Sequence, residues 1–202
     1  MDYFQNLADN SEFAEFFSFG SSPQGRELKY LLVTKESKIS VPLGKELLKP
    51  TILIINGIHS GEIEGKDASI ILMREILITK EKAYLLDSLN IIVVPIFNVD
   101  GHERKGKYNR INQNGPEEMG WRTTAQNLNL NRDWMKADTP EIQAMLKLCS
   151  RYIPDFIVDT HTTDGADYQC TVTYSVEWSK NMYQQTADWL GEKFAPFLER
   201  HV

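Results

Sequence analysis

Short runs of aliphatic residues, separated by helix-like segments, constrain the fold more than any other feature of the sequence. They are Leu28 to Thr34, Thr51 to Asn56, Asn90 to Ile96 and Asp155 to Thr160. Runs of this length that are rich in Ile, Val and Leu are typical of strands buried on both faces of a sheet. We therefore interpret each run as an interior strand.

The segments between these runs show helical patterns. From Glu62 to Thr79 the apolar residues recur at roughly helical spacing. Thr139 and Pro140 are typical of a helix cap and first turn, and they predict a helix that continues to Pro154. Strands that alternate with helices imply crossover connections. The sequence thus predicts an α/β fold with a mainly parallel or mixed central sheet and helices on both faces.

The ends of the chain give further predictions. The segment from Asp2 to Phe17 has a helical pattern, Tyr168 to Tyr174 resembles a strand, and Trp178 to Leu198 resembles a long amphipathic helix. No repeat or Pro/Gly/Ser-rich linker interrupts the chain, so residues 1–202 are expected to form one domain.

Composition narrows the classes of partner. The chain has 22 basic and 28 acidic residues, a net charge of −6, and its basic residues are scattered, which argues against nucleic acid as a partner. No apolar stretch is long enough to predict a membrane span. No signal peptide is predicted within the chain, and a secreted or periplasmic location stays open if a leader has been removed. Cys149 and Cys170 form neither a disulfide framework nor a metal-ligand spacing.

The motif from Asn56 to Glu62 directly follows a predicted buried strand, which is where open α/β sheets bind ligands. His59 and Glu62 are three positions apart, so both side chains can face a single ion on one helical turn. Imidazole nitrogen and carboxylate oxygen suit Zn²⁺, and a catalytic zinc typically takes three protein ligands. A simpler interpretation is that Glu62 only favours the dipole of a helix N-terminus.

A third ligand can come from the remaining histidines. The chain has 4 in all, and of these His161 also stands at the end of a predicted buried strand. Strand ends from one sheet can converge, which favours His161 as the partner of His59 and Glu62.

A polar segment of roughly forty residues, from Asn98 to Asp138, has no strong periodicity, and such loops are usually functional or disordered. It contains Arg122 and the pair Asn131-Arg132. A guanidinium can bind a carboxylate through two hydrogen bonds or stabilise an oxyanion. On spacing alone, however, the favoured interpretation is a solvated loop on which the arginines pair with acidic neighbours.

The order of these motifs resembles that of the M14 zinc carboxypeptidases of the carboxypeptidase A type. That family has a H-x-x-E motif after a strand, an N-P-D-G-like turn, an arginine, an Asn-Arg pair and a later strand-end histidine. The matching positions here are His59 to Glu62, Asn98 to Gly101, Arg122, Asn131-Arg132 and His161.

The resemblance implies a function for each position. One zinc ion per chain would be bound by His59, Glu62 and His161, and it would activate water. Arg122 would polarise the scissile carbonyl, while Asn131 and Arg132 would hold the terminal carboxylate of a peptide substrate.

The chain also departs from the family pattern. Gly61 stands where the carboxypeptidase A type often has an arginine that helps to bind extended substrates. Asn129 stands where an aspartate commonly supports the first histidine. The family's general-base glutamate would lie beyond Val202. We therefore expect a domain truncated at its C-terminus and poorly active alone.

Other functions use the same residues. A related zinc amide hydrolase that acts on N-acyl amino acids would need the same ligands and an arginine clamp. A non-catalytic peptide-binding domain would keep the zinc or the clamp but lack the base.

Overall fold

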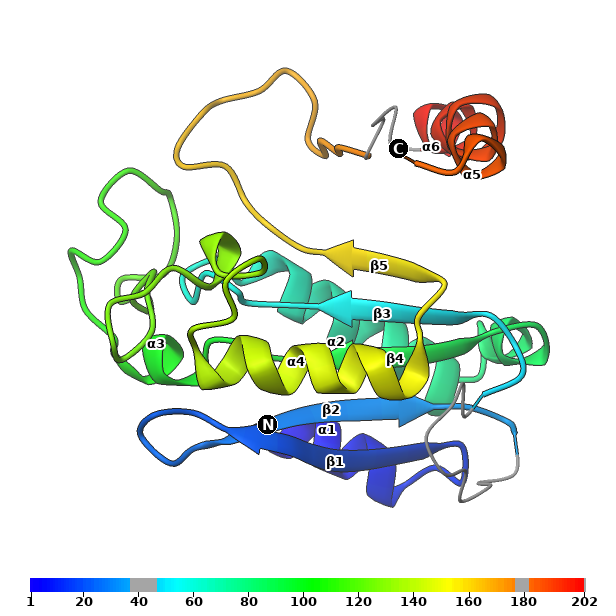
Figure 1. Cartoon of the computed structure of the whole chain (residues 1–202), viewed down its shortest axis with the longest axis horizontal. Coiled ribbons are helices and arrows are strands. Elements are labelled where there is room, and N and C mark those ends of the chain that lie inside the picture. Colours follow the sequence, from blue (N-terminus) through cyan, green and yellow to red (C-terminus); the bar gives the residue numbers. More distant parts are fainter. Residues whose placement is uncertain (37–46, 177–181, 202) are drawn as a thin grey trace. The chain divides into compact units, whose positions relative to one another are not determined.

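The computed structural model describes residues 1–36, 47–176 and 182–201 (Figure 1). The chain divides into two compact units, Met1–Gly165 and Ala166–Val202. The first unit contains, in chain order, α1 (Asp2–Asp9), β1 (Ala14–Ser21), β2 (Glu27–Val33), β3 (Thr51–Ile55), α2 (Glu64–Leu77), η1 (Ala83–Asp87), β4 (Asn90–Val94), α3 (Val99–Glu103), η2 (Leu130–Arg132), α4 (Pro140–Tyr152) and β5 (Phe156–Asp159). The second contains α5 (Gln184–Trp189), the π-helix η3 (Leu190–Phe194) and α6 (Ala195–His201). That residues 1–202 form one partial catalytic domain stays a prediction.

The predicted α/β fold with a mixed sheet is confirmed. The strands lie in the order β1-β2-β4-β3-β5. β2 is antiparallel to β1 and β4, whereas β3 is parallel to both β4 and β5. One expectation for the strands is wrong, because β5 lies at an edge of the described sheet and is not buried on both faces. Ile157 on β5 is accordingly 49% exposed.

Helices cover both faces of the sheet, with α4 on one face and α1 and α2 on the other (Figure 1). Successive side chains of a strand point to opposite faces. On β4, Ile92 belongs to the core cluster that includes Met145 of α4, whereas Val93 belongs to the cluster that includes Met73 of α2. The continuous run of aliphatic residues in β4 therefore contributes side chains to two separate hydrophobic cores.

The prediction of a helix from Asp2 to Phe17 is wrong in its second half. Helix α1 ends at Asp9, and Ala14–Ser21 forms the edge strand β1, which pairs with β2. Aromatic residues fit a pleated surface well. Phe17 packs against Tyr30 of β2, with ring centroids 5.4 Å apart, while Phe16 packs on the opposite face. Tertiary pairing with β2 thus outweighs the local helical spacing.

The predictions for the second unit are also partly wrong. No strand is present at Tyr168 to Tyr174, where every side chain is exposed, and the described part of this unit offers no strand to pair with them. The expected helix from Trp178 to Leu198 corresponds to α5, η3 and α6, which run from Gln184 to His201. Its first residues, 178–181, lie outside the described residues.

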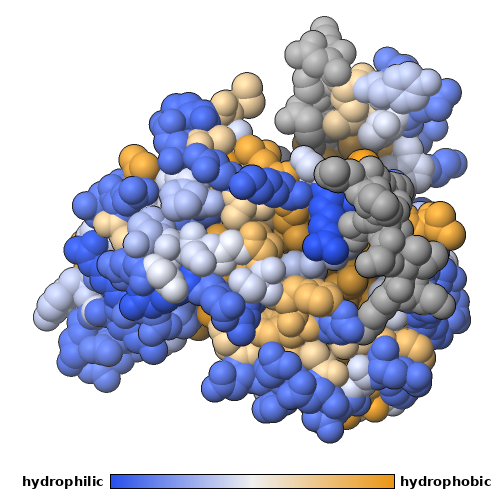
Figure 2. Space-filling view, turned by 60° about the horizontal axis from the view of Figure 1, so that its bottom comes forward, coloured by the Kyte–Doolittle hydropathy of each residue, from blue (hydrophilic) through white to orange (hydrophobic). Residues whose placement is uncertain are grey.

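The surface mixes polar and apolar regions. On the face shown in Figure 2, hydrophilic side chains dominate the left part of the view, and apolar side chains gather near the middle. Within the described residues, no helix combines the length and the apolar character needed to span a bilayer.

Gly65 allows the first turn of α2 to approach the end of β5. A methyl group at this position would overlap with the side chain of Thr160 and lie 2.8 Å from Oδ1 of Asn56. By helix propensity alone, Gly65→Ala would stabilise α2 by up to about 1 kcal/mol. Overpacking costs about 1–3 kcal/mol, so we expect a net loss of unfolding free energy in urea denaturation. Ala68→Gly, at an exposed position of α2, measures the propensity contribution separately. An unchanged or greater stability of Gly65→Ala would show that the contact is not tight.

The buried amine of Lys66 on α2 makes the free energy of unfolding change with pH in the alkaline range. Its side chain is 9% exposed, and burial lowers the pKa of the amine to about 8. The unfolded chain, with an ordinary pKa of about 10.4, therefore binds more protons between these two pH values, and stability rises with pH across this window. We expect Lys66→Met to raise the unfolding free energy at pH 7 by about 1–3 kcal/mol and to remove this rise. Lys147→Met, at an exposed position, is the matched control.

Candidate metal centre

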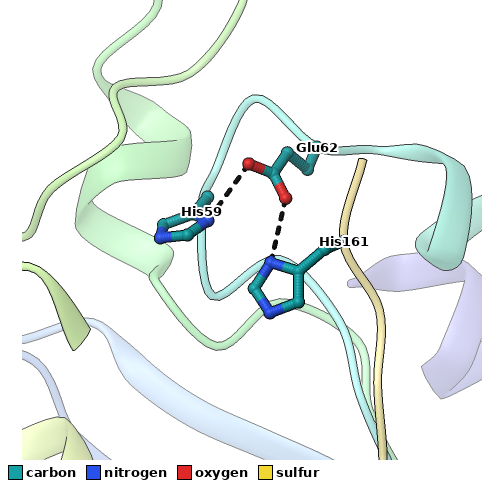
Figure 3. A group of neighbouring side chains, drawn as sticks. All are labelled: His59, Glu62 and His161. Atoms are coloured by element: carbon teal, nitrogen blue, oxygen red, sulfur yellow. Dashed lines mark hydrogen bonds and ion pairs between the residues drawn. The ribbon is translucent and has the colours of Figure 1, made fainter. Parts of the chain in front are cut away.

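The site lies at the carboxyl ends of the neighbouring parallel strands β3 and β5. The loop after β3 carries His59 and Glu62, and His161 follows β5 after one intervening residue, Thr160 (Figure 3). Thr160 continues the strand pairing, since its backbone N–H donates to the carbonyl of Ile55 at 3.0 Å. Its hydroxyl also donates to Oδ1 of Asn56 at 2.9 Å. The two ligand-bearing segments are therefore tied to each other directly behind the site.

The three expected ligand side chains converge. Nδ1 of His59 lies 3.0 Å from Oε1 of Glu62, and Nδ1 of His161 lies 3.1 Å from Oε2. One ligand atom from each residue lies within 4.8 Å of the others. His59 and Glu62 are each 3% exposed, whereas the side chain of His161 is 31% exposed. This geometry places two imidazoles on either side of one buried carboxylate.

The second nitrogen of each imidazole has an acceptor behind it. Nε2 of His59 lies 3.2 Å from Oδ1 of Asn129, and Nε2 of His161 lies 3.0 Å from Oδ2 of Asp159. Because these oxygens only accept, each Nε2 carries the hydrogen. In the neutral rings, Nδ1 then presents a lone pair toward Glu62. Such backing acceptors fix the tautomer of metal-binding histidines.

This arrangement fits a cation. Nδ1 of His59 is buried and, despite its short distance to Glu62, has no hydrogen-bond partner among the described residues. The lone pair of this unpartnered nitrogen faces a carboxylate oxygen and repels it unless a positive charge lies between the two atoms. Two imidazole nitrogens and one carboxylate are the donor set of a catalytic zinc site.

The electrostatics of the cluster are set by its hydrogen bonds. Burial alone would raise the pKa of the Glu62 carboxyl, but contacts with His161, His59 and Arg110 hold this pKa far below its usual range. Asp159 and then Glu62 raise the pKa of His161 to about 9. Glu62 is therefore ionised throughout the physiological range, as a metal ligand must be.

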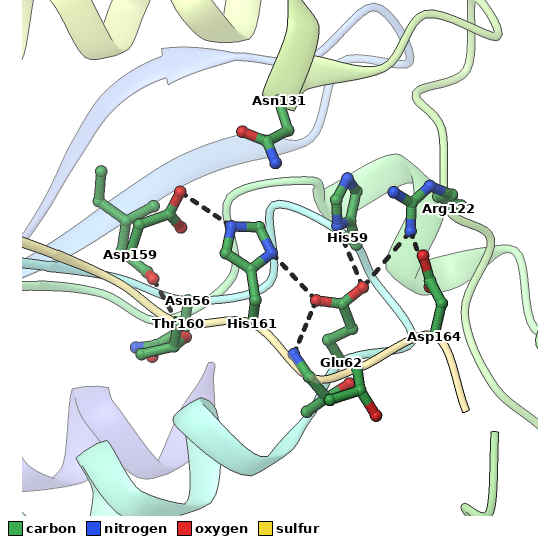
Figure 4. A network of polar contacts seen from close by, with 12 residues as sticks. Asn56, His59, Glu62, Arg122, Asn131, Asp159, Thr160, His161 and Asp164 are labelled. Carbon is green, nitrogen blue, oxygen red and sulfur yellow. Dashed lines mark hydrogen bonds and ion pairs between the residues drawn. The ribbon is translucent and has the colours of Figure 1, made fainter. Parts of the chain in front are cut away.

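Arg122 is brought to the same site. Its Nη1 lies 3.5 Å from Oε1 of Glu62 and 3.2 Å from Oδ1 of Asp164, and its side chain is 33% exposed (Figure 4). The turn at Asn98 fixes this arginine. Nδ2 of Asn98 donates to the backbone carbonyl of Arg122 at 3.2 Å, and the N–H of Trp121 donates to the carbonyl of Gly101 at 2.7 Å.

The pair Asn131-Arg132 is placed less directly. Figure 4 shows the amide of Asn131 pointing toward the two histidines. The exposed Arg132 donates from Nη1 to the carbonyl of Asn131 at 2.9 Å. No contact of Arg132 with the metal cluster is present among the described residues. Asn131 is thus brought to the site, while Arg132 lies beside it along the chain.

Some residues of the site have no clear signal in the sequence. Asp159 could have been found, since it lies two positions before His161 and strand residues two apart share a face. From irregular segments, the buried Arg110 contacts Glu62, and Asp164 contacts Arg110 and Arg122. The positions of both arginines depend on how residues 98–138 fold, and no periodic pattern in the sequence indicates this.

Fold and site together define a class: an α/β protein with a two-histidine, one-glutamate metal centre at the carboxyl ends of its strands. The family model described as zinc carboxypeptidase, Peptidase_M14, matches residues 1–201. The chain belongs to this family.

Individual relatives agree with this assignment. Carboxypeptidase Z from Homo sapiens is 33% identical over 129 residues, a match that covers 60% of this chain and 18% of that protein. Carboxypeptidase 2 from Trichophyton rubrum is 22% identical, with 79% of this chain and 27% of that protein covered. The chain therefore spans well under a third of these relatives.

Solved structures show the same fold. A metallo-carboxypeptidase from Pseudomonas aeruginosa matches with a TM-score of 0.62 and 22% identity, covering 82% of this chain and 39% of that one. Carboxypeptidase A from Helicoverpa armigera matches with a TM-score of 0.58 and 20% identity, covering 80% and 44%.

The ligand set predicts a specific response to mutation. We expect the purified chain to bind about one equivalent of zinc, and His161→Ala to abolish tight binding because it removes one of three ligands. His102→Ala is the control, since His102 lies on α3 and pairs with Glu103 at 3.2 Å. Metal analysis after dialysis measures both variants. Loss of zinc from His102→Ala with retention in His161→Ala would refute this ligand set.

Proposed function

We propose that the protein is a zinc-dependent carboxypeptidase that hydrolyses the C-terminal peptide bond of peptides. The observation that supports this proposal most directly is the convergence of His59, Glu62 and His161, with the guanidinium of Arg122 beside them. Family membership supports a peptidase, and the convergence of these side chains supports the role proposed for each of them.

His59, Glu62 and His161 would hold one zinc ion per chain. When bound, such an ion acidifies a coordinated water and acts as a Lewis acid toward a carbonyl. The protein's own contribution is to fix both imidazoles through Asn129 and Asp159 and to keep the carboxylate of Glu62 ionised.

Arg122 is suited to stabilise negative charge on the scissile carbonyl oxygen. It lies close enough to Glu62 to share the metal environment, and its partial exposure leaves donors free to reach a substrate. Its other partner, Asp164, is 60% exposed and gives a weak, solvent-screened ion pair. A substrate oxygen can therefore compete for the guanidinium at low cost.

Asn131 and Arg132 are suited to bind the free C-terminal carboxylate. The amide of Asn131 points toward the histidines, and no acidic side chain of the described residues lies within ion-pair distance of Arg132. The structure of the Pseudomonas aeruginosa metallo-carboxypeptidase is of a complex with (2-guanidinoethylmercapto)succinic acid. A carboxylic acid ligand in a protein of this fold supports a carboxylate-binding site here.

The two arginines should differ in their kinetic effects. In an active polypeptide that contains these residues, we expect Arg122→Ala to lower kcat by about 10²- to 10³-fold, because an oxyanion donor acts in the transition state. Arg132→Ala should mainly raise KM, because it removes a ground-state anchor. Steady-state kinetics on free-acid peptides measure both effects. Arg104→Ala is the control, because Arg104 is exposed and its guanidinium lies over the ring of Trp121.

Comparison of substrates tests the anchor directly. The loss caused by Arg132→Ala should be large for free-acid peptides and small for amidated ones. Equal losses on both would contradict the anchor role. A preference of the unmodified protein for N-acyl amino acids over peptides would instead favour an amide hydrolase.

A further inference from the structure

Arg110 places a second, fully buried guanidinium against the carboxylate of Glu62. Its side chain is 3% exposed, and Nη2 lies 2.9 Å from Oε1 of Glu62 and 2.9 Å from Oδ1 of Asp164. Nη1 is also buried, without a hydrogen-bond partner in the described parts of the chain. A guanidinium buried with an unmet donor is costly to the fold, which is unusual for a residue with only a structural role.

Gly61 provides the space that Arg110 occupies. A Cβ atom at Gly61 would lie 2.7 Å from Cγ and 3.2 Å from Cδ of Arg110. The aliphatic part of Arg110 therefore crosses directly over the backbone between His59 and Glu62. Any larger residue at position 61 would displace it.

The two oxygens of Glu62 are held in matching ways. Oε1 accepts from Nη2 of Arg110 at 2.9 Å and faces Nδ1 of His59. Oε2 accepts from the backbone N–H of Thr162 at 3.0 Å and faces Nδ1 of His161. Each oxygen thus has one fixed donor from outside the metal cluster. Without Arg110, only one of these two donors would remain to fix the plane of the carboxylate.

We propose that Arg110 is a positioning residue that sets the orientation of the Glu62 carboxylate toward the metal, and that Gly61 is required because it makes room for Arg110. This inference rests on the metal site of the proposed function. Arg122 cannot replace Arg110 in this role, because its nearest nitrogen is 3.5 Å from Oε1 and its side chain is one-third exposed.

Two effects of Arg110 on metal affinity oppose each other. A fixed carboxylate binds more tightly, and loss of such an orienting partner typically lowers metal affinity about 10- to 100-fold. A nearby cation, in contrast, repels the metal ion. Asp164 binds the same nitrogen at the same 2.9 Å as Glu62 and offsets much of that charge. The gain from a fixed carboxylate therefore outweighs the charge repulsion, and Arg110 strengthens metal binding.

The test is a zinc titration of the 202-residue chain against a chromophoric chelator. Arg110→Met keeps the length of the side chain but removes its charge and donors, and we expect zinc affinity to fall about 10- to 100-fold. Gly61→Ala should weaken binding in the same direction because it displaces Arg110. The double variant should bind no more weakly than Arg110→Met, because both changes remove the same contact. Arg104→Met, at an exposed position, is the matched control and should bind like the unmodified chain.

A spectroscopic measurement separates orientation from general destabilisation. The visible absorption of the Co²⁺-loaded chain reports the ligand geometry, so Arg110→Met and Gly61→Ala should both shift it, whereas Arg104→Met should not. If Arg110→Met does not fold, as judged by urea denaturation, Gly61→Ala decides the question.

The outcomes distinguish the inference from the function on which it rests. Unchanged or tighter zinc binding by Arg110→Met or by Gly61→Ala overturns the positioning role and leaves the zinc site intact. Failure of the unmodified chain to bind zinc at all overturns both this inference and the proposed function.

Discussion

The buried carboxylate of Glu62 is the interaction on which the rest of the site depends. An ionised carboxylate at 3% exposure is costly unless it is hydrogen-bonded and paired. The surrounding groups meet this requirement from several parts of the chain: two imidazoles, one buried guanidinium and one backbone N–H. Removal of any one of them leaves this buried charge with fewer partners. The loop after β3, the end of β5 and the long segment from residue 98 to residue 138 are therefore coupled through one side chain.

The sheet brings these parts together. Because β3 and β5 are parallel neighbours, both deliver their following residues to the same edge. The two core clusters, one under α4 and one under α1 and α2, make this edge rigid. The turn at Asn98 then fastens the long segment to it, since Asn98 binds the carbonyl of Arg122 and accepts from the hydroxyl of Ser60. These contacts anchor the irregular segment at defined points. They fix the backbone at Arg122, so its side chain can be held at the site without regular secondary structure.

The two histidines are supported differently, although they face the same carboxylate. His59 is buried and is backed by the neutral amide of Asn129, whereas the partly exposed His161 is backed by the charged Asp159. An ionised acceptor stabilises positive charge on an imidazole more strongly than an amide oxygen does. The raised pKa of His161 follows from this contact and from Glu62. His161 is also the more exposed of the two proposed ligands.

The sequence by itself predicted the α/β class, the positions of β2 to β5, the helices α2 and α4, and the candidate ligands His59, Glu62 and His161, whereas Arg122 was indicated only by the family resemblance. These follow from local signals, namely aliphatic runs, helical spacing and polar residues at strand ends. Only the tertiary structure decided that Ala14–Ser21 is a strand, because its aromatic residues gain more from pairing with β2 than from local helix formation. The tertiary structure alone also brought Arg110 to Glu62 and Asp164 to Arg110. Their contacts join residues 48 or more positions apart through irregular segments, and such long-range contacts leave no periodic trace in a single sequence.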